Sequence, residues 1–468
     1  MLTIQGPPYS DVHVIFWGSY MGSVTVGLDI GTTSIKAIAV DDDGRIVSRT
    51  RVPHRVLVPE PQQMEHDAEG AWRRGPRRAI AALGDVDAKA IAVTAMVPSL
   101  AAVDDRGRPV TPGLLYGDVR GQSRHGSASD PAASGEVVGF LEWAAGAAPG
   151  AHGYWPAQAV ANRSLGGAPA VDWAVALTSA PLYGADGWDG QICAECGARP
   201  EQLPTVEVPG APIGRSGKDG PLLTAGTVDV WCEQLVAGAD EDGDVLVICG
   251  TTLIVWAVVE GNRNPSGLWA VSHSKPERQL VGGASNGGGL FLDWARKLIG
   301  RPKSDERLDP ANVPVWTPYP RGERTPYHDP TMRAGLHDLD LTHGPAAVQR
   351  AAWEATGFVV RHHVDIAGGR ARRIVATGGG TRVAGWMDAL ADATGLPVHV
   401  AAEPEGAALG AAYLARVAAG LEADLTGSSR WARTGRVVDP DGRWAAGADG
   451  RYRRFVELSG TPGKVGRP

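Results

Sequence analysis

The chain has 468 residues, 43% of them hydrophobic and 21% charged, which is enough apolar material for two or three globular domains. The formal net charge is -7 and no basic stripe stands out, so nucleic acid is not an expected partner. No apolar run approaches the length of a membrane span, and four Cys in so long a chain favour a reducing compartment. We therefore expect a cytoplasmic protein without a membrane partner.

Residues 1–20 come before the first convincing strand. They contain a short apolar stretch around Phe16 but no basic segment, so a signal peptide is not expected. We interpret them as a disordered or non-native N-terminal extension and leave them out of the fold argument.

The first strong pattern is a β-hairpin over residues 27–40, in which Gly31, Thr32 and Thr33 separate two apolar strands. Backbone N–H groups and hydroxyls in such a turn are free to point at an anion. The residues that follow, 45–58, are strand-like, so we expect a meander of three antiparallel strands.

The rest of the first half is less regular. A helix is expected over 67–83 and a buried strand over 88–94. Residues 125–170 have weak periodicity, and no element is predicted there. A short strand over 222–225 then leads into a helix from about 228 to 237.

The hairpin pattern recurs further along the chain, where Gly250, Thr251 and Thr252 separate apolar strands at 246–249 and 253–259. A repeated hairpin suggests two related domains that face each other across a cleft, where ligands usually bind. The polar, flexible link at 238–243 marks the boundary. We therefore expect an α/β protein with domains at 21–238 and 244–425 and a C-terminal tail at 426–468, in which no element is predicted.

The second domain shows a clear order of elements. Pro345 can occupy the first position of a helix whose apolar face carries Val348, Ala352, Ala355 and Val359. The elements expected after it are a strand at 373–377, a helix at 384–394, a strand at 398–400 and a small-residue helix that opens at 405–412.

The two hairpins differ at one position, because the first has Asp29 where the second has Ile248. A carboxylate beside a phosphate-binding turn is repulsive unless a cation lies between them. Mg²⁺ held by one or two carboxylates and by phosphate oxygens resolves the repulsion. Asp29 is therefore the predicted magnesium ligand, and a turn-capping role is the alternative.

Two further segments suggest chemistry on a nucleotide. Gly378, Gly379, Gly380 and Thr381 lie between a predicted strand and a helix, where N–H groups and the positive helix end meet phosphates. Asp229 lies just inside a predicted helix and could accept the proton of an attacking hydroxyl. An acidic residue there is also favoured by the helix dipole, and the pattern alone leaves both readings open.

Together these segments resemble the FGGY family of carbohydrate kinases, within the actin-like ATPase superfamily. The matching residues are Gly27 to Ser34, Gln63-x-Glu65-x-Asp67 with Trp72, Gly287 to Leu290 with Trp294, Gly322 to Pro326, Ala376 to Gly380 and Glu405 to Ala412. The resemblance implies two RNase H-like domains with a central interdomain cleft, ATP held mainly by the second domain and the sugar mainly by the first.

The resemblance also implies roles for single residues. Asp229 would be the catalytic base and would touch the substrate, and Asp29 would lie near Mg²⁺. The residues implied around ATP are Gly31, Thr32, Thr33, Gly250, Thr251 and Thr252 at the phosphates, and Gly378, Gly379, Gly380, Thr381, Gly406 and Gly410 towards the adenosine.

Of the predicted sites, the sugar site is the one that resembles the family least. Asp118 and Arg120 resemble a segment that lines it in the family, with a surface ion pair as the alternative reading. Val97 and Pro98 fall at the same site, where xylulose kinases usually carry Met-His-Gly and glycerol kinases Arg-Glu. The substrate's identity therefore does not follow from the resemblance.

The sequence thus predicts ATP-dependent phosphorylation of a hydroxyl of a small ketose or polyol by a xylulose kinase-like enzyme that uses Mg²⁺, and it leaves a homodimer open. One alternative is a catalytically inactive relative that binds a sugar or nucleotide, suggested by the altered residues 97–99. Another is an actin-like ATPase that acts on a protein partner, against which the run Gly322 to Pro326 argues.

Overall fold

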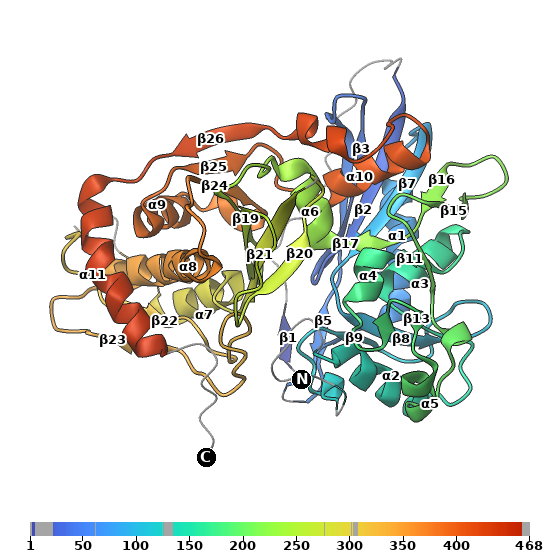
Figure 1. Cartoon of the computed structure of the whole chain (residues 1–468), viewed down its shortest axis with the longest axis horizontal. Coiled ribbons are helices and arrows are strands. Elements are labelled where there is room, and N and C mark those ends of the chain that lie inside the picture. Colours follow the sequence, from blue (N-terminus) through green and yellow to red (C-terminus); the bar gives the residue numbers. More distant parts are fainter. Residues whose placement is uncertain are drawn as a thin grey trace. The chain divides into compact units, whose positions relative to one another are not determined.

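The computed structural model describes residues 2–4, 22–60, 62–123, 125, 134–275, 277–300, 302 and 308–460. The chain divides into two compact units (Figure 1). The first unit consists of Met1–Val236 and Gly406–Trp431, and the second of Ala237–Glu405 and Ala432–Pro468. Residues 5–20 of the expected N-terminal extension lie outside the described residues, whereas Leu2–Ile4 form β1, which pairs with β5 (Val56–Val58).

A seven-stranded sheet organises the first unit, in the order β15-β16-β7-β2-β3-β4 with β17 beside β7. The predicted meander is confirmed, because β2, β3 and β4 are antiparallel neighbours, and β7 is the predicted buried strand. The strands are β2 (Val24–Ile30), β3 (Ser34–Val40), β4 (Ile46–Pro53), β7 (Ala88–Ala95), β15 (Pro212–Arg215), β16 (Leu222–Thr224) and β17 (Thr227–Val228).

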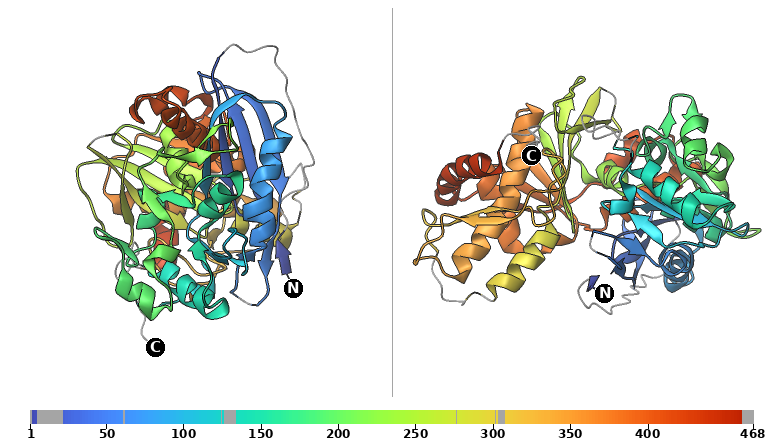
Figure 2. Two further views of the ribbon diagram at one scale, coloured as in Figure 1. Left: turned by 90° about the vertical axis from the view of Figure 1, so that its right-hand side faces the viewer. Right: turned by 90° about the horizontal axis from the view of Figure 1, so that it is seen from below.

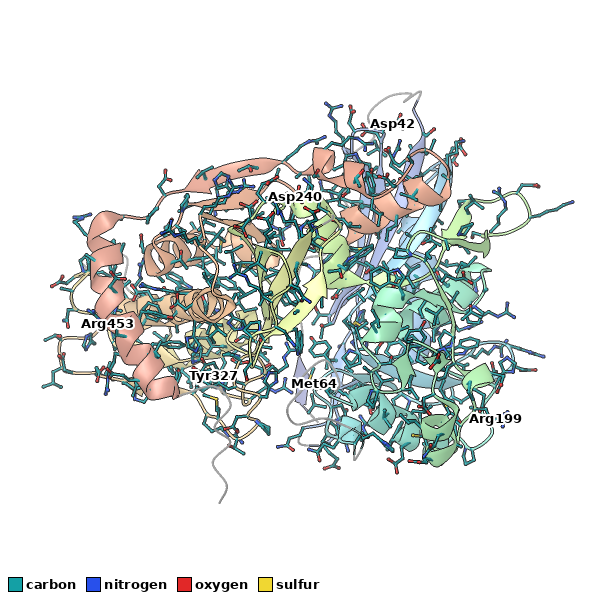
Figure 3. All side chains as sticks on the ribbon, viewed as in Figure 1. Asp42, Met64, Arg199, Asp240, Tyr327 and Arg453 are labelled. Carbon is teal, nitrogen blue, oxygen red and sulfur yellow. The ribbon has the colours of Figure 1, made fainter. Side chains whose placement is uncertain are left out.

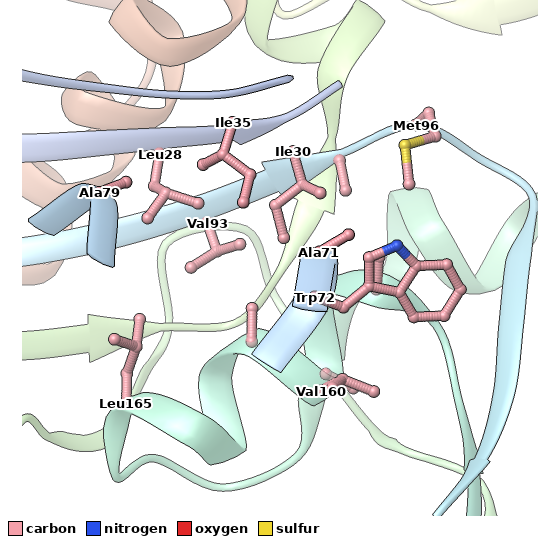
Figure 4. Close-up of a cluster of buried hydrophobic side chains, with 14 of the residues drawn as sticks. Leu28, Ile30, Ile35, Ala71, Trp72, Ala79, Val93, Met96, Val160 and Leu165 are labelled. Atoms are coloured by element: carbon pink, nitrogen blue, oxygen red, sulfur yellow. The ribbon is translucent and has the colours of Figure 1, made fainter. Parts of the chain in front are cut away.

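The main core of the first unit lies on one face of this sheet. Figure 4 shows Leu28 and Ile30 of β2 and Val93 of β7 in the same cluster as Trp72 and Val160. The helix expected over 67–83 forms as a π-helical turn, η1 (Glu69–Arg74), continued by α1 (Gly75–Ala82). Val160 comes from α3 (Ala157–Leu165), in the stretch where no element was predicted.

A second sheet, of six strands in the order β1-β5-β6-β9-β8-β10, extends the first unit. Its other strands are β6 (Glu65–His66), β8 (Ser99–Val103), β9 (Gly113–Leu115) and β10 (Gly153–Trp155). The remaining elements of this part are η2 (Val119–Gly121), α2 (Glu136–Ala147), β11 (Ala170–Asp172), α4 (Trp173–Leu177), β12 (Tyr183–Gly184), β13 (Gly187–Trp188), α5 (Gly190–Glu195), η4 (Pro200–Gln202) and β14 (Thr205–Glu207).

Helix α10 (Gly406–Ala418) returns the chain to the first unit, which differs from the predicted division at 244–425. The helix packs directly on β2 and β7, and the contact is so close that a Cβ on Gly27 would lie 1.7 Å from the carbonyl oxygen of Ala408. Thr25 also donates a 3.0 Å hydrogen bond to the carbonyl of Ala412. Small residues on both surfaces therefore decide which unit the helix joins.

The second unit is built on a seven-stranded sheet in the order β20-β21-β19-β18-β24-β25-β26. Figure 2 shows helix α11, in red, beside the orange helices of this unit. The strands are β18 (Asp244–Cys249), β19 (Leu253–Glu260), β20 (Trp269–Ser272), β21 (Arg278–Ser285), β24 (Arg373–Thr377), β25 (Val398–Ala401) and β26 (Thr434–Val438). The other elements are α7 (Gly289–Ile299), β22 (Val315–Thr317), β23 (Gly335–His337), α8 (Pro345–Ala367), η5 (Gly379–Arg382), α9 (Ala384–Thr394) and α11 (Gly442–Ser459).

The predicted tail at 426–468 contains regular structure. It forms η6 (Thr426–Trp431), the edge strand β26 and α11, whose Phe455 is fully buried in the core of the second unit. Arg453, labelled in Figure 3, lies on the exposed side of the same helix. In the part of the chain that the structure describes, no helix has both the length and the apolar character that crossing a membrane requires.

Buried charges fasten α11 to its neighbours. The Glu354 carboxylate of α8 accepts hydrogen bonds from Arg451 at 2.6 and 2.8 Å and from Arg350 at 2.9 Å. Arg350 also donates to Asp392 of α9 at 2.7 Å. Glu354 is fully buried, so loss of a partner would leave its charge short of compensation in a medium of low dielectric constant.

We expect Arg451→Met to destabilise the second unit by about 3 kcal/mol, because breaking a buried ion pair from one side is costly. The exposed pair between Arg454 and Asp338, on the same helix, provides the control, and Arg454→Met should change stability by at most about 0.5 kcal/mol. Thermal unfolding of the two variants measures the difference. Equal midpoints would show that the buried network does not hold α11 in place.

Candidate functional site

The first predicted hairpin forms in the first unit. The N–H of Gly31 donates to the carbonyl of Ser34 at 3.0 Å, and β2 and β3 pair so that Asp29 lies opposite Lys36. Asp29 is only 5% exposed, and the Lys36 ammonium lies 3.3 Å from its Oδ2. The sequence analysis missed Lys36, although directly opposed residues of a hairpin project from the same face and the register could have indicated it.

Asp229 reaches the same edge of the sheet from another strand. It follows β17 and begins α6 (Asp229–Ala237), and both β17 and β2 pair in parallel with β7, so Asp29 and Asp229 lie near the carboxyl ends of the two strands that flank β7. Ligands of open α/β sheets bind at such ends. The structure therefore brings together the predicted base and the predicted metal ligand, with Lys36 beside them.

The environment of Asp229 changes its acidity. Its Oδ1 accepts a 2.7 Å hydrogen bond from the N–H of Val230, and the side chain keeps part of its surface accessible. Burial and, after it, the negative charge of Asp29 raise the pKa of Asp229 to about 7, whereas Lys36 acts in the opposite direction. A carboxyl group with such a pKa can gain or lose a proton near neutral pH.

The charges at this edge suit a divalent cation. Two carboxylates, Asp29 and Asp229, are offset by one ammonium group, and carboxylate oxygens are preferred ligands of Mg²⁺. Among the described residues, no cluster of three or more His, Cys, Asp or Glu side chains could hold a metal ion without help. That donor set fits Mg²⁺, which usually takes one or two protein carboxylates and completes its shell with phosphate and water.

A chain of hydrogen bonds holds the tip of the first hairpin. The indole N–H of Trp72 donates to Nδ1 of His66 at 3.0 Å, and Nε2 of His66 lies 2.8 Å from the carbonyl oxygen of Thr32. An indole nitrogen can only donate, so Nδ1 of His66 must be the acceptor and Nε2 must carry the proton that reaches Thr32. Burial lowers the pKa of His66 to about 3, which keeps the ring neutral.

The hydroxyl of Thr32 is also engaged. It lies 2.9 Å from the hydroxyl of Tyr116, so the backbone and the side chain of this turn residue are both held from within the first unit. His66 and Tyr116 could not be predicted directly from the sequence, because their contacts with Thr32 join residues 34 and 84 positions apart in the chain. His66 does lie inside the matched stretch Gln63-x-Glu65-x-Asp67, and that was the available clue.

The second unit places its two predicted nucleotide segments at one edge of its own sheet. The hairpin Gly250–Thr252 follows β18, and Gly378–Thr381 follows β24, its parallel neighbour. The N–H groups of Gly289 and Leu290 donate to the carbonyls of Gly250 and Thr251 at 2.9 and 3.0 Å, so the start of α7 holds the hairpin. The second segment lies between β24 and α9, as predicted, and forms a 3₁₀ turn there.

Glu323 stabilises the loop that leads into α7, and the sequence analysis did not assign it a role. Its buried carboxylate accepts hydrogen bonds from the hydroxyl of Ser285 at 2.7 Å and from the N–H groups of Asn286 and Arg324 at 2.9 and 2.6 Å. Burial raises its pKa to about 7. The matched run Gly322 to Pro326 contains this residue, so it supports the hairpin of the second unit indirectly.

Other predicted site residues have internal partners. A Cβ on Gly406 would lie 2.5 Å from the Glu233 carboxylate, and one on Gly410 would lie 2.0 Å from the carbonyl oxygen of Cys232. Close helix packing therefore explains both glycines without a ligand. Contact between these two positions and a nucleotide stays a prediction.

Asp118 and Arg120 form a buried ion pair, not the surface pair considered as the alternative reading. The Asp118 side chain is fully buried and accepts hydrogen bonds from the N–H of Met64 at 2.6 Å and from the Arg120 guanidinium at 2.7 and 2.9 Å. Arg120 also pairs with Glu65 at 2.8 Å and lies over the ring of Trp143. These contacts hold the Asp118 carboxylate and the Nε and Nη2 atoms of Arg120 within the unit.

Comparison with known proteins decides the family. Residues 24–130 match the N-terminal domain of the FGGY family of carbohydrate kinases, and residues 245–419 match its C-terminal domain. The chain belongs to the FGGY family of carbohydrate kinases. It is therefore a sugar kinase by family, which implies ATP as the phosphoryl donor.

Similar proteins support the fold and leave the substrate open. The xylulose kinase of Escherichia coli strain K12 is 26% identical over 441 residues, 86% of this chain and 91% of the relative. The gluconokinase of Bacillus subtilis strain 168 is 22% identical over 86% of this chain and 88% of its own. The crystal structure of xylulose kinase from Rhodospirillum rubrum aligns with a TM-score of 0.75 and 26% identity over 93% and 98% of the two chains. The predicted two-domain α/β fold is confirmed.

We expect His66→Leu to raise the KM for ATP and lower kcat, together by about tenfold in kcat/KM, because the Thr32 carbonyl and the Trp72 N–H lose their partner. His66→Gln should retain most of the activity, since an amide can both accept from the indole and donate to the carbonyl. Steady-state kinetics with ATP varied measures both effects. Unaltered kinetics in His66→Leu would exclude a role for this contact in shaping the hairpin.

Proposed function

We propose that the chain transfers the γ-phosphoryl group of ATP to a hydroxyl of a small ketose or polyol, as a xylulose kinase-like enzyme with Asp229 as the general base. The placement of Asp229 carries the proposal. The residue is half-buried and lies at the carboxyl end of β17, near Asp29, with a pKa raised to about 7 by burial. A base is most effective when its pKa lies near the working pH.

The reaction follows from these groups. The N–H of Val230 holds Oδ1 of Asp229, so Oδ2 is the oxygen that can accept the proton of the acceptor hydroxyl. As that hydroxyl oxygen forms a bond to the γ-phosphorus, the bond between the γ-phosphorus and the bridging oxygen breaks and ADP leaves. The proton then resides on Asp229. The transition state of such transfers is loose, so most of the rate enhancement comes from positioning and charge stabilisation.

Asp29 is the proposed ligand of Mg²⁺. The proposal is supported by its burial, by the surplus of carboxylate over cationic charge at this edge, and by its place directly before the hairpin turn. When bound, Mg²⁺ supplies neutralisation of negative charge between the carboxylates and the phosphates. Lys36 offsets part of the Asp29 charge from within the chain.

The two hairpins are the proposed phosphate contacts. In this proposal Gly31–Thr33 and Gly250–Thr252 turn backbone N–H groups and hydroxyls towards the phosphates, and Gly378–Thr381 approaches the nucleotide from the second unit. The engaged backbone groups of both turns support this, since they fix the turn shape without consuming every N–H. The proposed contacts of Gly406 and Gly410 with the adenosine rest on the family resemblance alone.

Asp229→Asn should lose phosphorylation by about 10²- to 10⁴-fold in kcat while ATP binding persists, because the amide cannot accept the proton. Asp186→Asn, at an exposed position of the same unit, is the matched control and should behave as wild type. Steady-state kinetics with an acceptor that the wild type phosphorylates measure kcat, and calorimetric titration with ATP measures nucleotide binding. Retention of most of the kcat would assign the base to another residue.

The pH dependence gives an independent check. The rate constant kcat/KM should fall about tenfold per pH unit below a pKa near 7, because the protonated carboxyl group cannot act as a base. The raised pKa of Asp229 also affects the stability of the fold, which should fall as pH rises whereas activity should increase. The folded protein binds this proton more tightly than the unfolded chain does, so the stabilising contribution is complete below the ordinary Asp pKa of about 4 and is lost as pH rises through 7.

Asp229→Asn removes this charge and should therefore raise the thermal midpoint at pH 8, in the absence of ATP and Mg²⁺, by more than it does at pH 5. Other buried acids, such as Asp172 and Glu323, are present in both proteins and cancel in the comparison. A midpoint difference that does not change with pH would mean that Asp229 titrates at its ordinary value.

A further inference from the structure

A crevice opens in the first unit next to β17, the strand that leads into Asp229. The parallel register Thr227–Thr94 and Val228–Ala95 sets Asp229 beside the residue that follows β7, and Val97 and Pro98 come directly after it. A bridge between Val171 and Gly226 brings β11 to the same place. Val97, Pro98 and Val171 all line the crevice, so it lies next to the carboxyl end of β7, close in the fold to Asp229, which is not itself one of the lining residues.

The lining of the crevice is almost entirely apolar. Its walls include Val97, Pro98, Val171, Val175, Leu182 and Trp188, and no Asp, Glu, Lys, Arg or His is among its described lining residues. The cavity volume is about 20 Å³, which leaves room for one group the size of a water molecule or a methyl. Polyhydroxylated ligands need several polar groups to replace the water that they lose on binding.

The polar side chains of the lining are mostly engaged by main-chain groups. Trp188 donates to the carbonyl of Pro204 at 2.8 Å, Thr178 to that of Val175 at 2.7 Å and Tyr154 to that of Ala148 at 3.3 Å, while the hydroxyl of Ser99 accepts from the N–H of Ala157 at 3.2 Å. Ser179 is the fifth polar residue of the lining. A hydroxyl group placed in the crevice would therefore lose water and find few partners.

We propose that the acceptor of this chain carries an apolar end, a methyl or another deoxygenated carbon, which occupies this crevice while the reacting hydroxyl faces Asp229. The proposal rests on the phosphoryl transfer proposed above and specifies its substrate class: terminally deoxygenated ketoses or short diols, in place of fully hydroxylated polyols. A buried methyl gains from leaving water, whereas a hydroxyl at the same place loses hydrogen bonds. An apolar pocket of this kind discriminates against an added hydroxyl by about tenfold to about a hundredfold.

The test uses the full chain with ATP and Mg²⁺ and acceptors that differ by one oxygen. D-xylulose is compared with 1-deoxy-D-xylulose and with 5-deoxy-D-xylulose, and glycerol with 1,2-propanediol. ADP formation gives kcat/KM, and mass spectrometry identifies the phosphorylated product. We expect at least one methyl-ended compound to exceed its hydroxylated parent by tenfold or more. A preference for the parent in every set overturns the proposal while leaving the kinase function intact.

Variants of Val97 connect the preference to the crevice. Val97→Thr keeps the shape and adds a hydroxyl, so the ratio of kcat/KM between methyl-ended and hydroxylated acceptors should shrink several-fold. Val97→Ala adds no polarity and should keep the preference. Val110→Thr, at a position that is 53% exposed, is the matched control and should leave the ratio as in wild type. An unchanged ratio in Val97→Thr would show that the crevice does not contact the acceptor.

Binding without ATP separates the two proposals. Calorimetric titration of the same acceptors into the chain reports occupancy of the crevice whether or not phosphoryl transfer occurs. Tighter binding of the methyl-ended compounds without any phosphorylated product would support the crevice and reject the kinase reaction proposed for Asp229. Phosphorylation with no difference in binding or turnover between the members of each set would support the kinase reaction and reject the role of the crevice.

Discussion

The withdrawal of two nearby acids from water constrains the site in the first unit. Asp29 and Asp229 lie near the carboxyl ends of the two strands that flank β7, and Asp29 is buried while Asp229 is half-buried. Burial raises the pKa of Asp229 to about 7, with the negative charge of Asp29 acting in the same direction, so Asp229 holds its proton up to near neutral pH. Lys36 lies on the Asp29 side, which leaves Asp229 as the acid whose proton is exchangeable. The same arrangement thus makes Asp29 suited to bind a cation and Asp229 suited to exchange a proton.

The strands that create this arrangement depend on close packing behind them. Helix α10 lies against β2 at Gly27, where any side chain would collide with the Ala408 carbonyl, and against α6 at Gly410. Since α6 begins at Asp229 and β2 carries Asp29, the same helix supports both acids from the rear. The small residues at the start of α10, which were predicted to contact the nucleotide, are therefore required for close helix packing, whether or not they also contact a ligand.

Local patterns predicted the parts of the fold that local interactions determine. Both hairpins, the helix from Pro345 and the strand before Gly378 depend on residues close together in the chain, and all of them form where expected. The membership of α10 in the first unit could not be predicted, because it depends on a steric fit between segments almost 400 residues apart. The tail was left without elements for a similar reason, since α11 is fastened through Arg451 to a buried carboxylate on a distant helix.

The candidate site divides in the same way. Asp29 was visible because two similar hairpins differed there, whereas His66 and Lys36 became visible only through register and contact. Asp29 and Asp229 lie near the ends of the strands that flank β7, and the lining of the apolar crevice, which begins at Val97, contains neither of them. The acids proposed to act on phosphate and the crevice proposed to select the acceptor are therefore built from different residues. Changes at residues 97–99 can alter the acceptor without disturbing the acids, which is why a family can be assigned from the first set of residues while the substrate must be inferred from the second.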